Sequence, residues 1–205
     1  MKRIVATSDF DVKSFLLSKL NGSFEDYEFV FYSEFEEMIL NLENQYPDMV
    51  VIGKEKPDEN ILTYLKKVKN IFPDIPIVIT ASGGMSNYIL QALLVGACAF
   101  YSLDESENQS LNFAEMLKEI LGNKAEMNKE LARILCERIC ENNNRNDLFG
   151  RFLFTGREKK VLKYLNDNKS LKNISESLKS TEDEIKITIR NIFRKIHNFS
   201  MLYGI

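Results

Sequence analysis

Three basic side chains near the C-terminus are spaced for contact with a polyanion. Lys186, Arg190 and Arg194 follow one another at intervals of four residues, which places them on one face of an α-helix. Ammonium and guanidinium groups bind phosphates or the acceptor atoms of guanine, and Ile187 beside them can contact a thymine methyl group. The pattern therefore predicts a helix face that docks on a DNA duplex.

The opposite side of the same segment is apolar. Its isoleucines recur at helical spacing and form a narrow stripe: Ile185, Ile189, Ile192 and Ile196. In a helix over 182–196, one side would then pack while the other stays free to dock. This is the geometry by which the second helix of a helix-turn-helix enters the major groove.

Two shorter helices are expected to hold this one in place. Thr155 with Glu158, and Thr181 with Glu184, match the capping box, in which a hydroxyl and a carboxylate satisfy backbone donors of the first turn. Ser170 is a candidate N-cap between them. The segment from Thr155 onward therefore predicts three successive helices.

The charge of the chain is divided unevenly. Residues 151–205 hold 12 Lys and Arg against 6 Asp and Glu, so this segment is +6, and the remainder is −9 because the whole chain is −3. A small basic module joined to an acidic body is typical of a polyanion-binding tail on a regulatory protein.

The first 121 residues alternate short β-branched runs with segments of helical spacing. The runs are RIVAT (3–7), EFVFY (28–32), MVVIG (49–53), PIVIT (76–80) and ACAFY (97–101). Five strands that alternate with five helices predict an α/β fold, a doubly wound parallel sheet covered on both faces.

A linker is expected to separate this domain from the basic tail. Residues 126–141 repeat an apolar stripe and predict a linker helix, and the polar run NNNRND (142–147) follows it. We therefore expect an α/β domain over 1–121, a linker helix and polar linker over 122–150, and an all-α helix-turn-helix domain over 151–205.

The tail shows a family resemblance. Residues 154–196, FTGREKKVLKYLNDNKSLKNISESLKSTEDEIKITIRNIFRKI, resemble the LuxR/NarL-type DNA-binding domain of bacterial response regulators in their opening Thr-x-Arg-Glu, their Val-Leu pair and their closing Asn-Ile-x-Arg-Lys. The resemblance implies base contacts from Lys186, Ile187 and Arg190. It also implies contacts to the DNA backbone near Thr188 and Lys195.

Three acidic residues depart from the family pattern. Glu184 replaces the usual small hydroxyl residue, and with Glu182 and Asp183 it puts negative charge where the helix approaches phosphates. Two functions therefore stay open: a transcription regulator that binds DNA, and an interaction protein that sequesters a partner regulator without binding DNA. We also expect a shortened fourth helix, because the sequence ends at Ile205.

The N-terminal part resembles a receiver domain in its strand order and in the segments PDMVVIG (47–53), PIVITA (76–81) and GACAF (96–100). In receivers an aspartate that ends the third strand accepts a phosphoryl group. Two acids after the first strand help to hold Mg²⁺, a Ser or Thr ends the fourth strand, and a lysine follows the fifth. By position, the acceptor aspartate falls on Gly53 and the two acids fall on Ser8 and Asp9. The Ser or Thr falls on Thr80 and the lysine falls on Leu103.

This set lacks the chemistry of a phosphorylated receiver. Transfer to a carboxylate needs the nucleophile, and a divalent cation needs several oxygen ligands. Only Asp9 and Thr80 keep the residue types of the family. We therefore expect a pseudo-receiver that acts independently of aspartate phosphorylation, with no cofactor and no metal.

Receivers often pair through their fourth helix, fifth strand and fifth helix. On this resemblance Tyr88, Leu93, Tyr101 and the segment 113–121 are candidates for a dimer interface, although an apolar residue there is also compatible with an ordinary core. The hypothesis is a constitutive homodimer that presents two basic tails to a two-fold operator.

Other function classes have little support. The chain has one histidine, His197, and no phosphate-binding loop or metal-ligand cluster, so we do not expect an enzyme. Cys98, Cys136 and Cys140 form an odd set that favours buried thiols over a disulfide framework or a metal site. With no apolar run of membrane-spanning length and no signal peptide, a cytoplasmic protein is expected.

Overall fold

The computed structural model describes residues 2–8, 10–20, 27–55, 60–82, 86–104, 112–122, 127, 129–141 and 154–203. They form two compact units, residues 1–123 and residues 124–205. Within the described ranges, no helix combines the length and apolar character that crossing a membrane requires.

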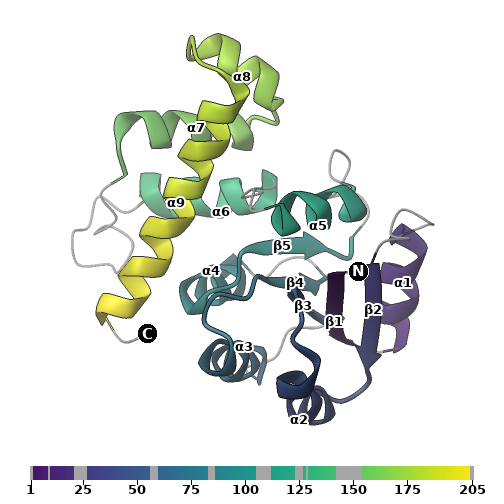
Figure 1. Ribbon diagram of the computed structural model, residues 1–205. Coiled ribbons are helices and arrows are strands. Elements are labelled where there is room, and N and C mark those ends of the chain that lie inside the picture. The colour runs from purple at the N-terminus through teal and green to yellow at the C-terminus, as the bar shows by residue number, and fades with distance from the viewer. Residues whose placement is uncertain are drawn as a thin grey trace. The chain divides into compact units, whose positions relative to one another are not determined.

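The first unit is built on one parallel sheet of five strands (Figure 1). The strands are β1 (Lys2–Ser8), β2 (Tyr27–Tyr32), β3 (Met49–Lys54), β4 (Ile77–Ala81) and β5 (Ala99–Ser102). Their order across the sheet is β2-β1-β3-β4-β5. The predicted doubly wound α/β fold is confirmed, and each strand lies within two residues of its predicted bounds.

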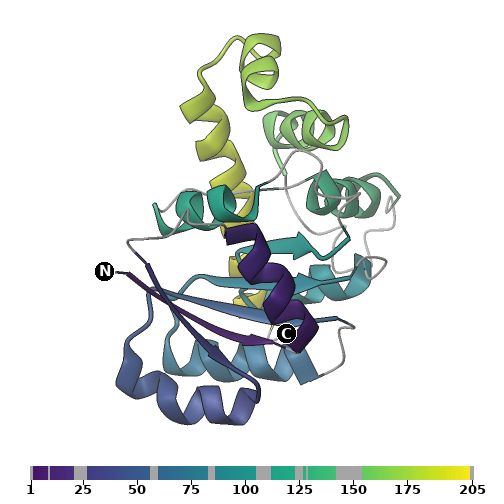
Figure 2. The same cartoon turned by 90° about the vertical axis from the view of Figure 1, so that its right-hand side faces the viewer.

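Helices cover both faces of this sheet. They are α1 (Phe10–Leu20), α2 (Phe35–Gln45), α3 (Asn60–Ile71), α4 (Ser86–Val95) and α5 (Phe113–Leu121). Helices α1 and α5 are neighbours on one face, and α2, α3 and α4 lie side by side on the other (Figure 2). Because both faces are covered, strand residues that point in opposite directions, such as Ile4 and Val5, are both fully buried.

Strand β5 begins later than predicted because the preceding helix ends in a tight cap. Gly96 has a φ of 118°, a conformation that favours glycine. The backbone N–H of Ala97 then turns back to donate to the carbonyl of Ala92 (2.9 Å). Ala97 therefore completes the cap of α4 instead of starting the strand.

The second unit consists of α6 (Lys129–Glu141), α7 (Gly156–Asn166), α8 (Leu171–Ser177) and α9 (Glu182–Tyr203). Helix α6, which the sequence predicts as a linker, packs against α7, and both α7 and α8 contact α9. Helix α9 runs without a break for 22 residues. The sequence analysis expects a shortened fourth helix, and in the described residues α9 instead continues to Tyr203 as one helix.

The three predicted N-caps of this unit are confirmed. The Thr155 hydroxyl accepts a hydrogen bond from the N–H of Glu158 (3.2 Å), and the Thr181 hydroxyl accepts one from the N–H of Glu184 (3.2 Å). Both glutamates complete the capping box by accepting from the backbone N–H of the threonine. Ser170 caps α8 in the simpler way, without the reciprocal carboxylate.

Candidate functional site

Helix α9 has two chemically different sides. The predicted stripe of Ile185, Ile189, Ile192 and Ile196 is buried, with each side chain at most 3% exposed. Phe193, which the sequence analysis did not include, is buried with them. This apolar side fixes the rotation of α9 about its own axis, because turning the helix would expose all five side chains to water.

The other side of α9 carries the predicted contact residues. Arg190 and Arg194 are exposed, Lys186 is half-buried, and Ile187 is 49% exposed, which is unusual for an isoleucine in a packed helix. Within the part of the chain that the structure describes, none of these three cations forms an ion pair. The helix therefore presents positive charge and one exposed apolar side chain on the same face.

Thr188 does not share this exposed face. Its side chain is 7% exposed, and its hydroxyl donates to the backbone carbonyl of Glu184 one turn earlier (2.8 Å). A hydroxyl used in this way has no proton left to donate to a phosphate. The implied contact from Thr188 to the DNA backbone is therefore corrected to a bond within the helix.

Lys195 also has a partner inside the unit. Its ammonium donates to the Glu158 carboxylate at 2.7 Å, and the same carboxylate oxygen accepts from the backbone N–H of Thr155 (2.6 Å). Glu158 is only 5% exposed. The sequence analysis assigned Lys195 to DNA and Glu158 to a cap, and the structure joins them into one clamp between α7 and α9.

The charge of Glu158 is maintained by this clamp. Burial alone raises the pKa of a carboxyl group, but the hydrogen bonds from Lys195 and from Thr155 outweigh it and hold the pKa of Glu158 below its ordinary value. The clamp is therefore a charge-assisted bond at neutral pH.

The acidic first turn of α9 is partly neutralised from α7. The Glu184 carboxylate lies 3.6 Å from the Arg157 guanidinium, and both side chains are about half exposed. The same carboxylate oxygen accepts from the backbone N–H of Thr181. Glu184 thus takes part in a cap and an ion pair, and all three acidic residues of this turn, Glu182, Asp183 and Glu184, are exposed.

The acceptor position in the first unit is closed. Strand pairing places Gly53 between Ser8 on β1 and Thr80 on β4. A Cβ atom added to Gly53 would lie 2.7 Å from the Val12 Cγ1 atom, 2.8 Å from the Thr80 Oγ1 atom and 3.1 Å from the Ser8 Cβ atom. There is consequently no room for a carboxylate unless the neighbouring side chains move.

The other residues of the receiver-like set do not restore a reaction centre. Ser8 and Thr80 are buried, and neither hydroxyl has a hydrogen-bond partner among the described residues. Leu103 packs against the apolar core, and Asp9 lies outside the described residues. Across the described ranges, no group of three metal-ligating side chains comes together.

The proposed dimer face is mostly interior. Leu93 is 1% exposed and Tyr101 is 3% exposed, and the Tyr101 ring packs on Phe113 with ring centroids 4.8 Å apart. These two residues are corrected from an interface to the core, because their apolar character serves the packing of the unit itself. Tyr88 is half-buried.

Two curated relatives match most of the chain. An uncharacterized transcriptional regulatory protein of Bacillus subtilis, YhcZ, is 24% identical over 155 residues, which span 76% of this chain and 70% of that protein. A nitrate/nitrite response regulator homologue of Haemophilus influenzae is 27% identical over 151 residues, or 74% and 68% of the two chains. No model of a protein family matches the chain.

Solved structures show the same fold. A LuxR-family two-component response regulator from Aurantimonas covers 67% of this chain and 97% of its own, with a TM-score of 0.56 and 19% identity. A structure of two RcsB dimers bound to two parallel DNAs covers 96% and 93%, with a TM-score of 0.56 and 15% identity. Together with the curated relatives, which are named as a transcriptional regulatory protein and a response regulator, this shared fold confirms the predicted resemblance to LuxR/NarL-type response regulators.

The close contact at Gly53 predicts a loss of stability on substitution. Gly53→Ala should lower the free energy of unfolding of the first unit by about 1–3 kcal/mol, because the added methyl group overlaps Val12 and Thr80. Urea unfolding followed by circular dichroism measures the change. Gly156→Ala is the matched control, since a Cβ atom there meets no other atom within 4 Å. The tight fit is refuted if both variants are equally stable.

The clamp between Lys195 and Glu158 predicts a pH dependence. Because the pKa of Glu158 is lower in the folded protein than in the unfolded chain, its stabilisation is complete above the ordinary carboxyl pKa of 4.5 and is lost as pH falls through the folded pKa. Glu158→Gln should therefore destabilise the second unit by roughly 1–3 kcal/mol near neutral pH, and the difference from wild type should shrink in acid.

Hydrogen exchange of peptides from 154–196 measures this stability separately from the first unit. Glu176→Gln, an exposed position on α8, serves as the control and should change little at either pH. If the second unit of Glu158→Gln is less stable than that of wild type by the same amount at neutral and at acid pH, the carboxylate charge has no role in the stability of this unit.

Proposed function

We propose that this chain is a transcription regulator of the response-regulator type, which binds duplex DNA through the exposed face of α9 and acts without phosphorylation of its first unit. The observation that carries the proposal is the two-sided α9. Its buried isoleucines hold the helix, and Lys186, Ile187, Arg190 and Arg194 remain on the outside.

The exposed face of α9 offers both kinds of contact that a regulator needs. Arginine and lysine bind phosphates at any sequence, which gives affinity, and they can also bind the major-groove edge of guanine, which gives specificity. An exposed isoleucine adds an apolar contact of the kind that a thymine methyl group provides. The RcsB structure with DNA, which shares this fold, supports the assignment.

The closed acceptor position supports the proposed phosphorylation independence. The residue at position 53 has no nucleophile, and the space beside it is filled by Val12 and Thr80. Because the two buried hydroxyls next to it supply no charge, they are poor ligands for a divalent cation. We propose that the first unit contributes contacts to partners or to a second copy of this chain, and that its effect on DNA binding needs no phosphoryl group.

Binding as a homodimer is part of the proposal. RcsB is bound to DNA as dimers, and a two-fold arrangement would place two copies of α9 on successive half-sites. Since Leu93 and Tyr101 are core residues, we propose that the dimer surface is formed by other residues. The stoichiometry of the duplex complex, measured by sedimentation, decides between one and two copies.

Substitution of the exposed cations should weaken DNA binding. Arg190→Ala should cost roughly 1–3 kcal/mol on a selected site if the guanidinium makes a bidentate base contact. Lys186→Ala should weaken binding to all sequences if it contacts a phosphate, with a shallower dependence of log affinity on log salt. Fluorescence anisotropy with duplexes selected from a random library measures both.

Lys172→Ala is the control for these variants, because Lys172 is an exposed cation on α8. Unchanged affinity in both Arg190→Ala and Lys186→Ala would remove α9 as the recognition helix. If the wild-type chain retains no duplex at low salt and co-purifies with another regulator, the sequestering function is the correct one.

The acidic first turn should oppose DNA binding. Glu184→Gln keeps a capping side chain but removes the charge that pairs with Arg157, so that Arg157 becomes available to a phosphate. We expect a several-fold gain in duplex affinity and a steeper salt dependence. Glu176→Gln on α8 is the control, and equal affinities for the two variants would argue against a role for this charge.

A small-molecule phosphate donor should have no effect on the protein. After incubation with acetyl phosphate and Mg²⁺, the intact mass and the duplex affinity should both stay unchanged, because position 53 offers no carboxylate. Mass spectrometry and the anisotropy titration are the measurements. A mass increase of one phosphoryl group, accompanied by tighter DNA binding, would overturn phosphorylation independence.

A further inference from the structure

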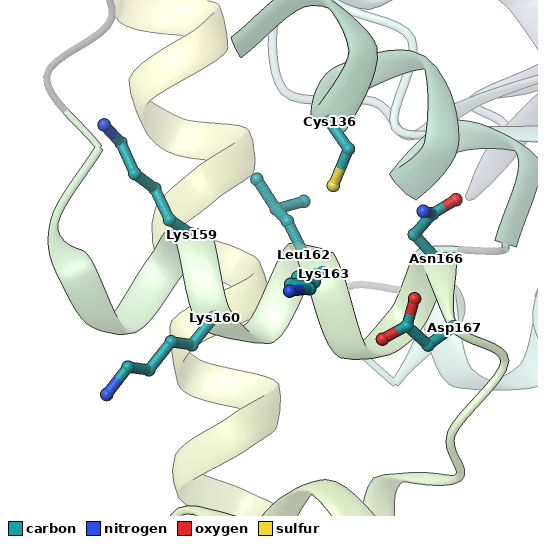
Figure 3. A pocket seen from close by; sticks show the side chains of 7 residues that line it. All are labelled: Cys136, Lys159, Lys160, Leu162, Lys163, Asn166 and Asp167. Atoms are coloured by element: carbon teal, nitrogen blue, oxygen red, sulfur yellow. The ribbon is translucent and has the colours of Figure 1, made fainter. Parts of the chain in front are cut away.

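A cavity lies between α6 and α7 in the second unit (Figure 3). Its volume is about 390 Å³, which is within the range of small-molecule sites in proteins. The lining residues come from these two helices and the turn after α7: Cys136, Lys159, Lys160, Leu162, Lys163, Asn166 and Asp167.

The inner wall of this cavity is apolar. Cys136 on α6 is half-buried, and the lysines on α7 line the cavity with their methylene groups, whereas Leu162 beneath them is 0% exposed. Figure 3 shows the Cys136 thiol and the Leu162 side chain pointing toward each other across the space between the two helices. An apolar group placed there would be removed from water, which favours binding.

The rim of the cavity is basic. Lys159 and Lys163 lie four residues apart and therefore share a face of α7, and Lys160 extends outward beside them (Figure 3). All three are exposed, and none makes an ion pair with another residue in the described ranges. Asp167 supplies the single carboxylate of the lining, so the rim has a net positive charge.

We infer that this cavity binds a small organic anion, with an aromatic or short aliphatic body against Cys136 and the methylene groups of the lysines and one carboxylate, sulfonate or phosphate group at Lys159 and Lys163. The Asn166 amide at the same face can donate a further hydrogen bond to the anionic group. A molecule that has both an apolar body and an anionic group can use the apolar wall and the lysines together. An inorganic anion gains nothing from the apolar wall.

A neutral apolar molecule gains nothing from the lysines, and Asp167 disfavours a second negative charge at its end of the cavity. The site therefore selects one charged group on a compact apolar body. This inference does not depend on DNA binding, because its residues are on α6 and α7 and the proposed DNA contacts are on α9.

Two fluorescent molecules with closely related aromatic bodies test the inference. The anion 8-anilinonaphthalene-1-sulfonate should bind the full 205-residue chain with a saturable increase in fluorescence. N-phenyl-1-naphthylamine lacks the sulfonate and should bind at least tenfold more weakly. Lys159→Glu/Lys163→Glu should weaken binding of the sulfonate at least tenfold, while its circular dichroism spectrum stays that of wild type.

Lys172→Glu/Lys179→Glu is the matched control, because it makes the same change in net charge at exposed lysines outside the cavity. Equal affinity of the two double variants, or equal affinity for the two fluorescent molecules, would overturn the proposed site. If the sulfonate binds an unfolded fraction of the protein, its fluorescence increases in mild urea. That increase would overturn the proposal as well.

Alkylation of Cys136 locates the bound molecule. Saturating 8-anilinonaphthalene-1-sulfonate should slow the reaction of Cys136 with N-ethylmaleimide several-fold, as measured by peptide mass spectrometry, because the ligand covers the thiol that lines the cavity. An unchanged rate at saturation places the ligand elsewhere and refutes the inference.

Discussion

The second unit depends on the packing of one side of α9. Five apolar side chains of this helix are at least nine-tenths buried, and at roughly 1.5–3 kcal/mol for each fully buried side chain their burial contributes on the order of 10 kcal/mol. The bond from Lys195 to Glu158 adds a directional contact between α9 and α7. Because burial fixes the rotation of the helix, the positions of Lys186, Ile187, Arg190 and Arg194 on its outer face follow from where the isoleucines lie.

The first unit has a five-stranded parallel sheet in the order β2-β1-β3-β4-β5, with glycine at position 53. Gly53 lies one residue before the end of β3, and strand pairing aligns it with Ser8 and Thr80. The Val12 Cγ1 atom lies only 2.7 Å from where a Cβ atom at position 53 would stand. The sheet and its helices are held by apolar contacts that do not involve this position, and for this reason the fold can persist without the reaction.

Much of the fold could be predicted from local patterns. Alternation of β-branched runs with helical segments gave the five strands and their helices, and Thr155, Ser170 and Thr181 marked the helix starts, because capping depends on neighbours within one turn. The site was less predictable. Lys195 and Glu158 are 37 residues apart, so no local pattern shows that they pair, and the burial of Leu93 and Tyr101 depends on how helices and strands pack.

The sequence by itself determined the two architectures, the amphipathic character of α9 and the absence of a nucleophile at position 53, because these depend on residue type and spacing. Only the tertiary structure decided that Lys195 and Thr188 are engaged inside the unit, that Arg157 faces Glu184, that α6 packs on α7 beside a cavity, and that Val12 closes the acceptor position. Apart from the bond of Thr188 within its own helix, these are contacts between different elements, and residue spacing carries no information about which side chains such packing brings together.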